Sequence, residues 1–197
     1  AQQINLMGVS YGTRVAQQYA ARYPEHTRTV TLDSIAPNTL VLGQEHALNL
    51  DAAIKQQFAR CVADTACKRN IGDPAALLAR VRTTLQAGGL AAVRYRDPTN
   101  GEWRVEIPKF EHLGSLLRFY AYRPESASML PLILHDAADG RYETLLSQSR
   151  ALSGDIGDSI ALGMHLSVSC TEDPEIAIRP EDDATIMGND IVEFIQA

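Results

Sequence analysis

The sequence of 197 residues lacks a long hydrophobic run and has no cluster of basic residues. No stretch of about 18 apolar residues occurs, so neither a membrane-spanning helix nor a membrane partner is expected. The 18 Lys and Arg are outnumbered by 24 Asp and Glu, which gives a net charge of −6. Because the basic residues are scattered, we expect no surface that neutralises phosphates, and nucleic acid is not a predicted partner.

Cysteine is also scarce, with residues only at Cys61, Cys67 and Cys170. None belongs to a CxxC pair or lies near a histidine at metal-ligand spacing, so we expect neither a metal nor another cofactor. Cys61 and Cys67 are close enough to form a small disulfide across a helix end, which would indicate an oxidising compartment. Two reduced thiols are the alternative. Cys170 is left over, either as a free thiol or with a partner outside the chain.

The first 36 residues have the pattern of a βαβ unit. The apolar run Ile4–Met7 predicts a strand, Thr13–Tyr23 has apolar residues at helical spacing, and Thr29–Leu32 predicts a second buried strand. Parallel strands joined by a helix normally belong to a larger sheet covered on both faces, so we expect the rest of that sheet outside this chain. Two such strands would leave open edges that favour self-association.

From about Gly43 the pattern becomes helical. One interruption has strand-like segments at 92–95 and 103–107 on either side of turn residues, which predicts a β-hairpin. The expected fold class is therefore α/β and mostly α: one βαβ unit, a large helical part and one hairpin. The expected helices span Gln44–Val62, Pro74–Ala87, Lys109–Tyr122, Ser126–Asp139, Tyr142–Leu152, Gly157–Val168, Asp182–Met187 and Asp190–Ile195.

One motif in the βαβ unit carries chemistry, the sequence Gly8-Val9-Ser10-Tyr11-Gly12. A G-x-S-x-G on a strand-to-helix turn holds the serine in a strained conformation, and side chains two residues away would collide with it. Gly8 and Gly12 occupy those two positions. The turn would expose Ser10 Oγ as a nucleophile and direct the N–H of Tyr11 toward a developing oxyanion. The structural alternative is a glycine-lined turn with an ordinary serine.

A nucleophilic serine needs a histidine base oriented by a carboxylate, in the chain order serine, acid, histidine. His135 and His165 each follow aspartates and satisfy this order. Both lie in expected helices, however, whereas a triad histidine in this fold comes from a loop after the last strand. We therefore expect the acid and the base beyond Ala197.

Several segments together resemble the α/β-hydrolases of the proline iminopeptidase and tripeptidyl aminopeptidase type, which are secreted bacterial serine exopeptidases with a large helical cap. The elbow Gly8–Thr13, the helix end Tyr19–Pro24 and the strand Val30–Ser34 look like this family's nucleophile strand, helix and next strand. Cys61–Cys67 is similar to the cysteine pair at the start of its cap, and Ser167–Pro174 to a segment near the cap's end.

The resemblance implies a division of the chain into three parts: a core fragment at 1–40, a helical cap at 41–180 and a segment returning to the core at 181–197. It also implies further core strands before Ala1, and strands with the catalytic aspartate and histidine after Ala197, so the chain alone would be inactive. A later cysteine could pair with Cys170. The implied location is secreted or periplasmic.

An exopeptidase of this type needs a carboxylate to pair with the ammonium group of its peptide substrate, and Glu172 and Asp173 are the candidates. The alternative is that these two residues cap or solvate a helix end. The aromatic residues Phe119, Tyr120 and Tyr122 would line a substrate pocket or, alternatively, form part of the core.

The leading hypothesis is thus part of a serine aminopeptidase. The competing hypotheses are a non-catalytic helical interaction module that retains an elbow, and an esterase or lipase on the same scaffold.

Overall fold

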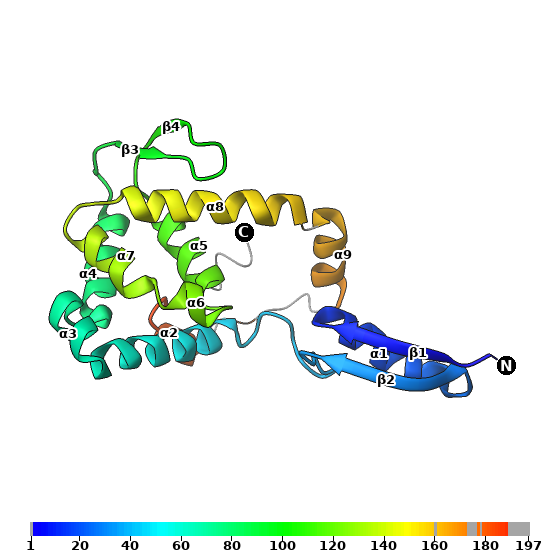
Figure 1. Cartoon of the computed structure of the whole chain (residues 1–197). Helices are drawn as coiled ribbons and strands as arrows, with labels where there is room; N and C mark the ends of the chain where they lie inside the picture. The colour runs from blue at the N-terminus through cyan, green and yellow to red at the C-terminus, as the bar shows by residue number, and fades with distance from the viewer. Residues whose placement is uncertain (1, 160, 173–176, 178, 189–197) are drawn as a thin grey trace. The chain divides into compact units, whose positions relative to one another are not determined.

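The computed structural model describes residues 2–159, 161–172, 177 and 179–188. The chain divides into two compact units, Ala1–Leu42 and Gly43–Ala197, which are described separately below (Figure 1). The expected fold class is confirmed: one parallel strand pair with its connecting helix, a larger helical part and one antiparallel hairpin.

The first unit is a βαβ unit. Strand β1 (Ile4–Val9) leads into helix α1 (Tyr11–Arg22), and a short 3-10 turn at Pro24–His26 leads into strand β2 (Thr27–Asp33). The strands are parallel, with Ile4 opposite Thr27 and Val9 opposite Asp33. Helix α1 ends just before Pro24, because proline cannot continue a helix.

The expected burial of the second strand is wrong. Most of β2 is exposed, including Val30 at 41%. The β-branched residues that predicted a buried strand are present, but within this unit only α1 packs on the strand pair. The residues of β2 suit a strand that is covered on both faces, whereas in this unit helix α1 covers one face of the strand pair.

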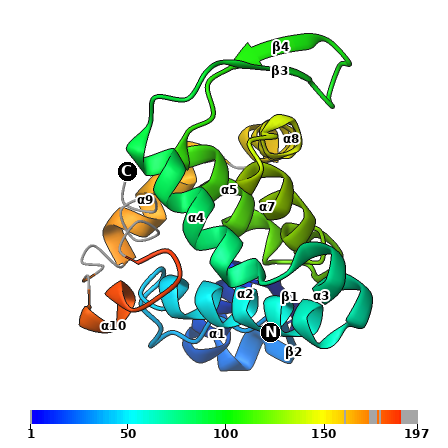
Figure 2. The same cartoon turned by 90° about the vertical axis from the view of Figure 1, so that its left-hand side faces the viewer.

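The second unit is helical and surrounds a core of leucine and isoleucine side chains. Figure 2 shows α4 and α7 side by side, and α5 also packs against α8. Fully buried core residues include Ile54, Leu78, Leu113, Leu117 and Leu134. Its elements are α2 (His46–Ala63), α3 (Thr65–Ile71), α4 (Pro74–Ala87), β3 (Val93–Arg96), β4 (Trp103–Glu106), α5 (Phe110–Tyr120), α6 (Pro124–Ala127), α7 (Leu130–Ala138), α8 (Glu143–Ser159), α9 (Leu162–Glu172) and α10 (Pro180–Asp183).

Two features of the helical unit differ from the prediction. The expected helix at Ser126–Asp139 is two helices, α6 and α7, with Pro131 in the first turn of α7. Proline lacks an N–H and its ring clashes with the carbonyl four residues earlier, so it fits a helix start and breaks a helix interior. Helix α3 was not predicted. Its start is capped by Asp64, which accepts a hydrogen bond from the Cys67 amide at 2.7 Å.

The remaining boundaries differ at the C-terminal side. Helix α8 continues to Ser159, beyond the end of the helix expected at Tyr142–Leu152. Helix α9 ends at Glu172 and both starts and ends later than the helix expected at Gly157–Val168. The helix expected at Asp182–Met187 is the short α10. The helix expected at Asp190–Ile195 lies outside the described residues.

A disulfide joins Cys61, in the last turn of α2, to Cys67 in α3, with the two Cα atoms 5.2 Å apart. The link closes the tight turn between the two helices. Cys170 is an exposed free cysteine in α9.

The hairpin is anchored to α8 through the buried carboxylate of Asp97 in its turn. Asp97 accepts hydrogen bonds from the Thr99 amide at 3.0 Å, from the Thr99 hydroxyl at 2.6 Å and from Arg150 Nε of α8 at 3.2 Å. Arg104 Nε of β4 is a further donor. These hydrogen bonds, the two from Thr99 first, hold the pKa of Asp97 well below its usual range.

Candidate active site

Ser10 lies at the junction between β1 and α1, with φ 53° and ψ −124°. This left-handed conformation is costly for a residue with a side chain and persists only where the surroundings enforce it. The Ser10 amide donates to the Asp33 carbonyl at 3.0 Å, which fixes the turn to the end of β2. Ser10 is exposed, and its side chain makes no capping hydrogen bond to the helix. The hydroxyl is therefore presented at the tip of the turn.

The two motif glycines have different roles in the structure. A Cβ at Gly8 would lie 2.4 Å from the Gly12 carbonyl oxygen and 2.8 Å from the Thr13 Cα, so any side chain there would force the backbone to shift. The expected collision at Gly12 is absent, because a Cβ there would have no described atom beyond its own helix turn within 4 Å. Gly8 is thus the position at which the turn requires glycine.

Thr13 fixes the backbone of the turn, and no motif in the sequence predicts this role. Its side chain is fully buried, and both its amide (3.0 Å) and its hydroxyl (2.6 Å) donate to the Ser10 carbonyl. The hydroxyl oxygen also accepts from the Ala36 amide at 2.9 Å. Gln17 Nε2 donates to the Thr13 and Ala36 carbonyls, each at 3.0 Å. One buried threonine therefore connects the Ser10 turn to the loop after β2.

Arg14 of α1 also contacts the loop after β2, at residues further from the strand. The side chain is 7% exposed, and its guanidinium donates to the carbonyls of Pro37 at 3.2 Å and of Leu40. The loop begins at Ser34, which is the other non-glycine residue with a positive φ, at 57°, among the described residues. The Ser34 hydroxyl donates to the Asp33 carboxylate at 3.2 Å. Strained backbone thus occurs on both sides of the Ser10–Asp33 contact.

The pattern of the alpha/beta hydrolase fold family matches residues 1–133, about two thirds of the sequence. This chain belongs to the α/β-hydrolase family. The matched region includes the Ser10 turn, so family membership suggests a hydrolase. No curated protein and no solved structure matches the chain.

Within the βαβ unit of this α/β-hydrolase, the described residues include one histidine, and it is far from Ser10. His26 precedes Thr27 at the start of β2, whereas Ser10 is bonded to Asp33 at the other end. Six strand residues separate these positions by roughly 20 Å. His26 Nε2 instead lies 3.4 Å from the carboxylate of Glu25. His26 therefore cannot act as the base for Ser10.

The two histidines that satisfied the triad order lie in the helical unit. His135 of α7 has its Nδ1 3.8 Å from Asp136 and 4.0 Å from Asp139, all within the same helix region. His165 is exposed on α9. Neither occupies a loop after a strand, which is the setting of a triad histidine in this fold.

The residues predicted to recognise the substrate are the carboxylates Glu172 and Asp173 and the aromatic residues near the end of α5. Glu172 is exposed and is the last residue of α9, whereas Asp173 lies outside the described residues. Tyr120 is buried in the core and donates to Gln148, so the core alternative holds for this aromatic residue. Tyr122 is 66% exposed.

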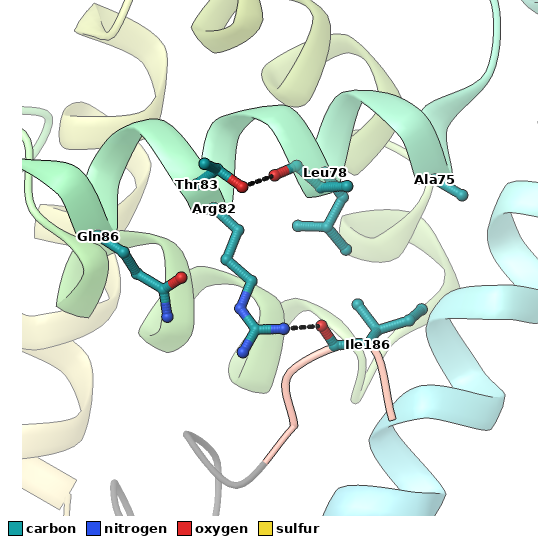
Figure 3. A pocket seen from close by; sticks show the side chains of 7 residues that line it. Ala75, Leu78, Arg82, Thr83, Gln86 and Ile186 are labelled. Atoms are coloured by element: carbon teal, nitrogen blue, oxygen red, sulfur yellow. Dashed lines mark hydrogen bonds between the residues drawn. The ribbon is translucent and has the colours of Figure 1, made fainter. Parts of the chain in front are cut away.

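The helical unit contains at least two cavities that are lined by described residues. Figure 3 shows one of about 390 Å³ along α4, where Arg82 extends to the Ile186 carbonyl and donates to it at 3.0 Å. A second, of about 220 Å³, lies between α2 and the end of α5. No group of three or more potential metal ligands occurs among the described residues, and no helix described is long and apolar enough to cross a membrane.

Proposed function

We propose that this α/β-hydrolase is a serine hydrolase that cleaves acyl bonds through Ser10, with peptides as substrates. The observation that supports the proposal is the conformation of Ser10, a strained residue exposed between a strand and a helix and enforced by contacts at Gly8 and Thr13. Backbone strain in a non-glycine residue commonly occurs at functional sites. A glycine-lined structural turn has no need for this conformation.

In the proposed reaction, Ser10 Oγ attacks the carbonyl carbon of the scissile bond while a base removes the hydroxyl proton. The tetrahedral oxyanion accepts a hydrogen bond from the N–H of Tyr11, the first residue of α1. Collapse expels the amine, which takes the proton from the base, and leaves an ester on Ser10. Water then hydrolyses the ester. The histidine base and its acid come from outside the βαβ unit.

We further propose that the enzyme is an aminopeptidase of the proline iminopeptidase type. Glu172 and Asp173 would pair with the ammonium group of the substrate. The segment resemblances of the cysteine pair and of Ser167–Pro174 support this assignment. The Cys61–Cys67 disulfide supports an oxidising compartment, so the proposed location is secreted or periplasmic.

The test compares three substrate classes with the native protein: peptide p-nitroanilides with free N-termini, the same peptides with blocked N-termini, and short p-nitrophenyl esters. An aminopeptidase turns over the free peptides far faster than the blocked ones, and Ser10→Ala lowers kcat on the order of 10⁴-fold or more. Ser128→Ala, an exposed serine of the helical unit, is the matched control. Equal turnover of blocked peptides contradicts ammonium pairing, and turnover of esters alone favours an esterase.

A further inference from the structure

The cavity between α2 and the end of α5 combines one cation with apolar lining residues. It has a volume of about 220 Å³ and lies between the first half of α2 and the end of α5. Its lining residues are His46, Asn49, Leu50, Ala53, Arg118, Ala121 and Tyr122. None of these is acidic, so the positive charge of Arg118 is not balanced by the lining.

Arg118 is held in position by two neighbours within the cavity. Its Nη2 lies 3.3 Å from His46 Nδ1, and its guanidinium carbon lies 5.2 Å from the centre of the Tyr122 ring. Because a guanidinium can only donate, His46 Nδ1 accepts and the proton of the neutral imidazole is on Nε2. Among the described residues, no carboxylate forms an ion pair with Arg118. One of its five N–H donors is directed at His46, and none of them pairs with a carboxylate of the described part of the chain.

His46 does not add a second charge at neutral pH. Burial, and then the positive charge of Arg118, lower the pKa of His46 to about 4. The cavity therefore has a net charge of +1 with neutral donors from His46 and Asn49. Leu50, Ala53 and Ala121 contribute apolar side chains to the lining, in addition to the Tyr122 ring.

We propose that this cavity is a binding site for a carboxylate joined to a compact apolar group. The Arg118 guanidinium pairs with the carboxylate, which matches its planar fork, and the apolar group contacts Leu50, Ala53 and the Tyr122 ring. A single cation favours a monoanion, because a phosphate dianion would leave one negative charge unpaired against an apolar wall. Two sources share this chemistry, the C-terminus of a peptide and a free organic acid. The proposal does not depend on the nucleophile, so it stands or fails separately from the proposed hydrolase activity.

The test is a titration of the ¹⁵N-labelled protein followed by ¹H–¹⁵N spectra. N-acetyl-leucine is expected to produce saturable shifts at the lining residues, and N-acetyl-leucinamide, which lacks the carboxylate, is expected to produce none. Arg118→Gln is expected to weaken binding about tenfold or more, since a charge-assisted hydrogen bond is lost. Arg123→Gln removes the same charge from an exposed residue that does not line the cavity, and is expected to leave binding unchanged.

A second variant covers the case in which Arg118→Gln perturbs the fold. Ala53→Leu fills the cavity, keeps the charge and preserves helix propensity in α2, so it is expected to abolish the shifts. Ser10→Ala is expected to bind normally. Comparison with 4-methylpentanoate separates the sources: tighter binding of N-acetyl-leucine indicates a peptide C-terminus, and equal binding a free organic acid. Equal shifts with the amide, no saturable shifts, or unchanged binding in both Arg118→Gln and Ala53→Leu would overturn the proposal.

Discussion

The amide of Ser10 donates to the carbonyl of Asp33 at 3.0 Å, so the turn at Ser10 is bonded directly to the last residue of the neighbouring strand. The Ser10 carbonyl is held at the same time by the amide and hydroxyl of Thr13. Both polar backbone groups of Ser10 therefore have fixed partners. Such fixation maintains a strained φ that an unconstrained serine would leave.

The first prediction separates the two glycines of the motif. Gly8→Ala places a Cβ 2.4 Å from the Gly12 carbonyl oxygen, so it is expected to destabilise the βαβ unit by about 1–3 kcal/mol. Gly12→Ala has open space and lies within α1, so it is expected to be neutral or to stabilise by up to about 1 kcal/mol. Chemical denaturation of the two variants measures the difference. Equal destabilisation would show that the turn is not packed as described.

The second prediction concerns the strain at Ser34. Its φ of 57° suits glycine, so Ser34→Gly is expected to raise the free energy of unfolding by about 1 kcal/mol. Ser34→Val is expected to lower it, because a β-branched residue disfavours this region most. Denaturation curves of both variants give the comparison. A stabilising valine would contradict the assigned backbone conformation.

The third prediction follows from the pKa of His46, which is lowered from 6.5 in the unfolded chain to about 4. Between these values the unfolded state binds a proton and the folded state does not, so stability falls as pH falls from 6.5 to 4. For a half-buried ring the contribution is about 1–2 kcal/mol after allowance for solvent screening. His46→Gln is expected to reduce this part of the pH dependence. The measurement is the free energy of unfolding at pH 7 and at pH 4.5 in the parent protein and in His46→Gln. The same decrease in both proteins would refute the prediction.

The fourth prediction concerns the disulfide between α2 and α3. Cys61 and Cys67 are 6 positions apart, and opening so short a loop is expected to cost about 2 kcal/mol through the entropy of the unfolded chain. Thermal melts with and without reductant measure this loss. Cys170→Ser, which leaves the bond intact, is expected to melt as the parent does. An unchanged melting temperature on reduction would count against a stabilising link.

The parts of the fold that the sequence predicted correctly are those set by neighbouring residues. The strand, turn and helix around Ser10 follow from the glycine spacing and from Pro24. The hairpin follows from the turn residues after Asp97. In both cases local backbone preference and tertiary structure agree.

The parts that were missed depend on contacts between distant residues. The hydrogen bonds that Thr13 and Arg14 make with the loop after β2 span more than twenty residues, and no local pattern indicates them. The empty space beside Gly12 likewise depends on packing. Helix α3 and the division at Pro131 were predictable in principle, from the Asp64 cap and from the position of proline.

The central claim, that Ser10 is a nucleophile, is tested most directly by covalent labelling of the native protein with a fluorophosphonate. Mass spectrometry of the digested protein is expected to place the phosphonyl group on Ser10. Labelling is expected to disappear in Ser10→Ala and to persist in Ser34→Gly, which removes the neighbouring exposed hydroxyl without adding strain. An unlabelled native protein, or labelling that persists in Ser10→Ala, would contradict the claim.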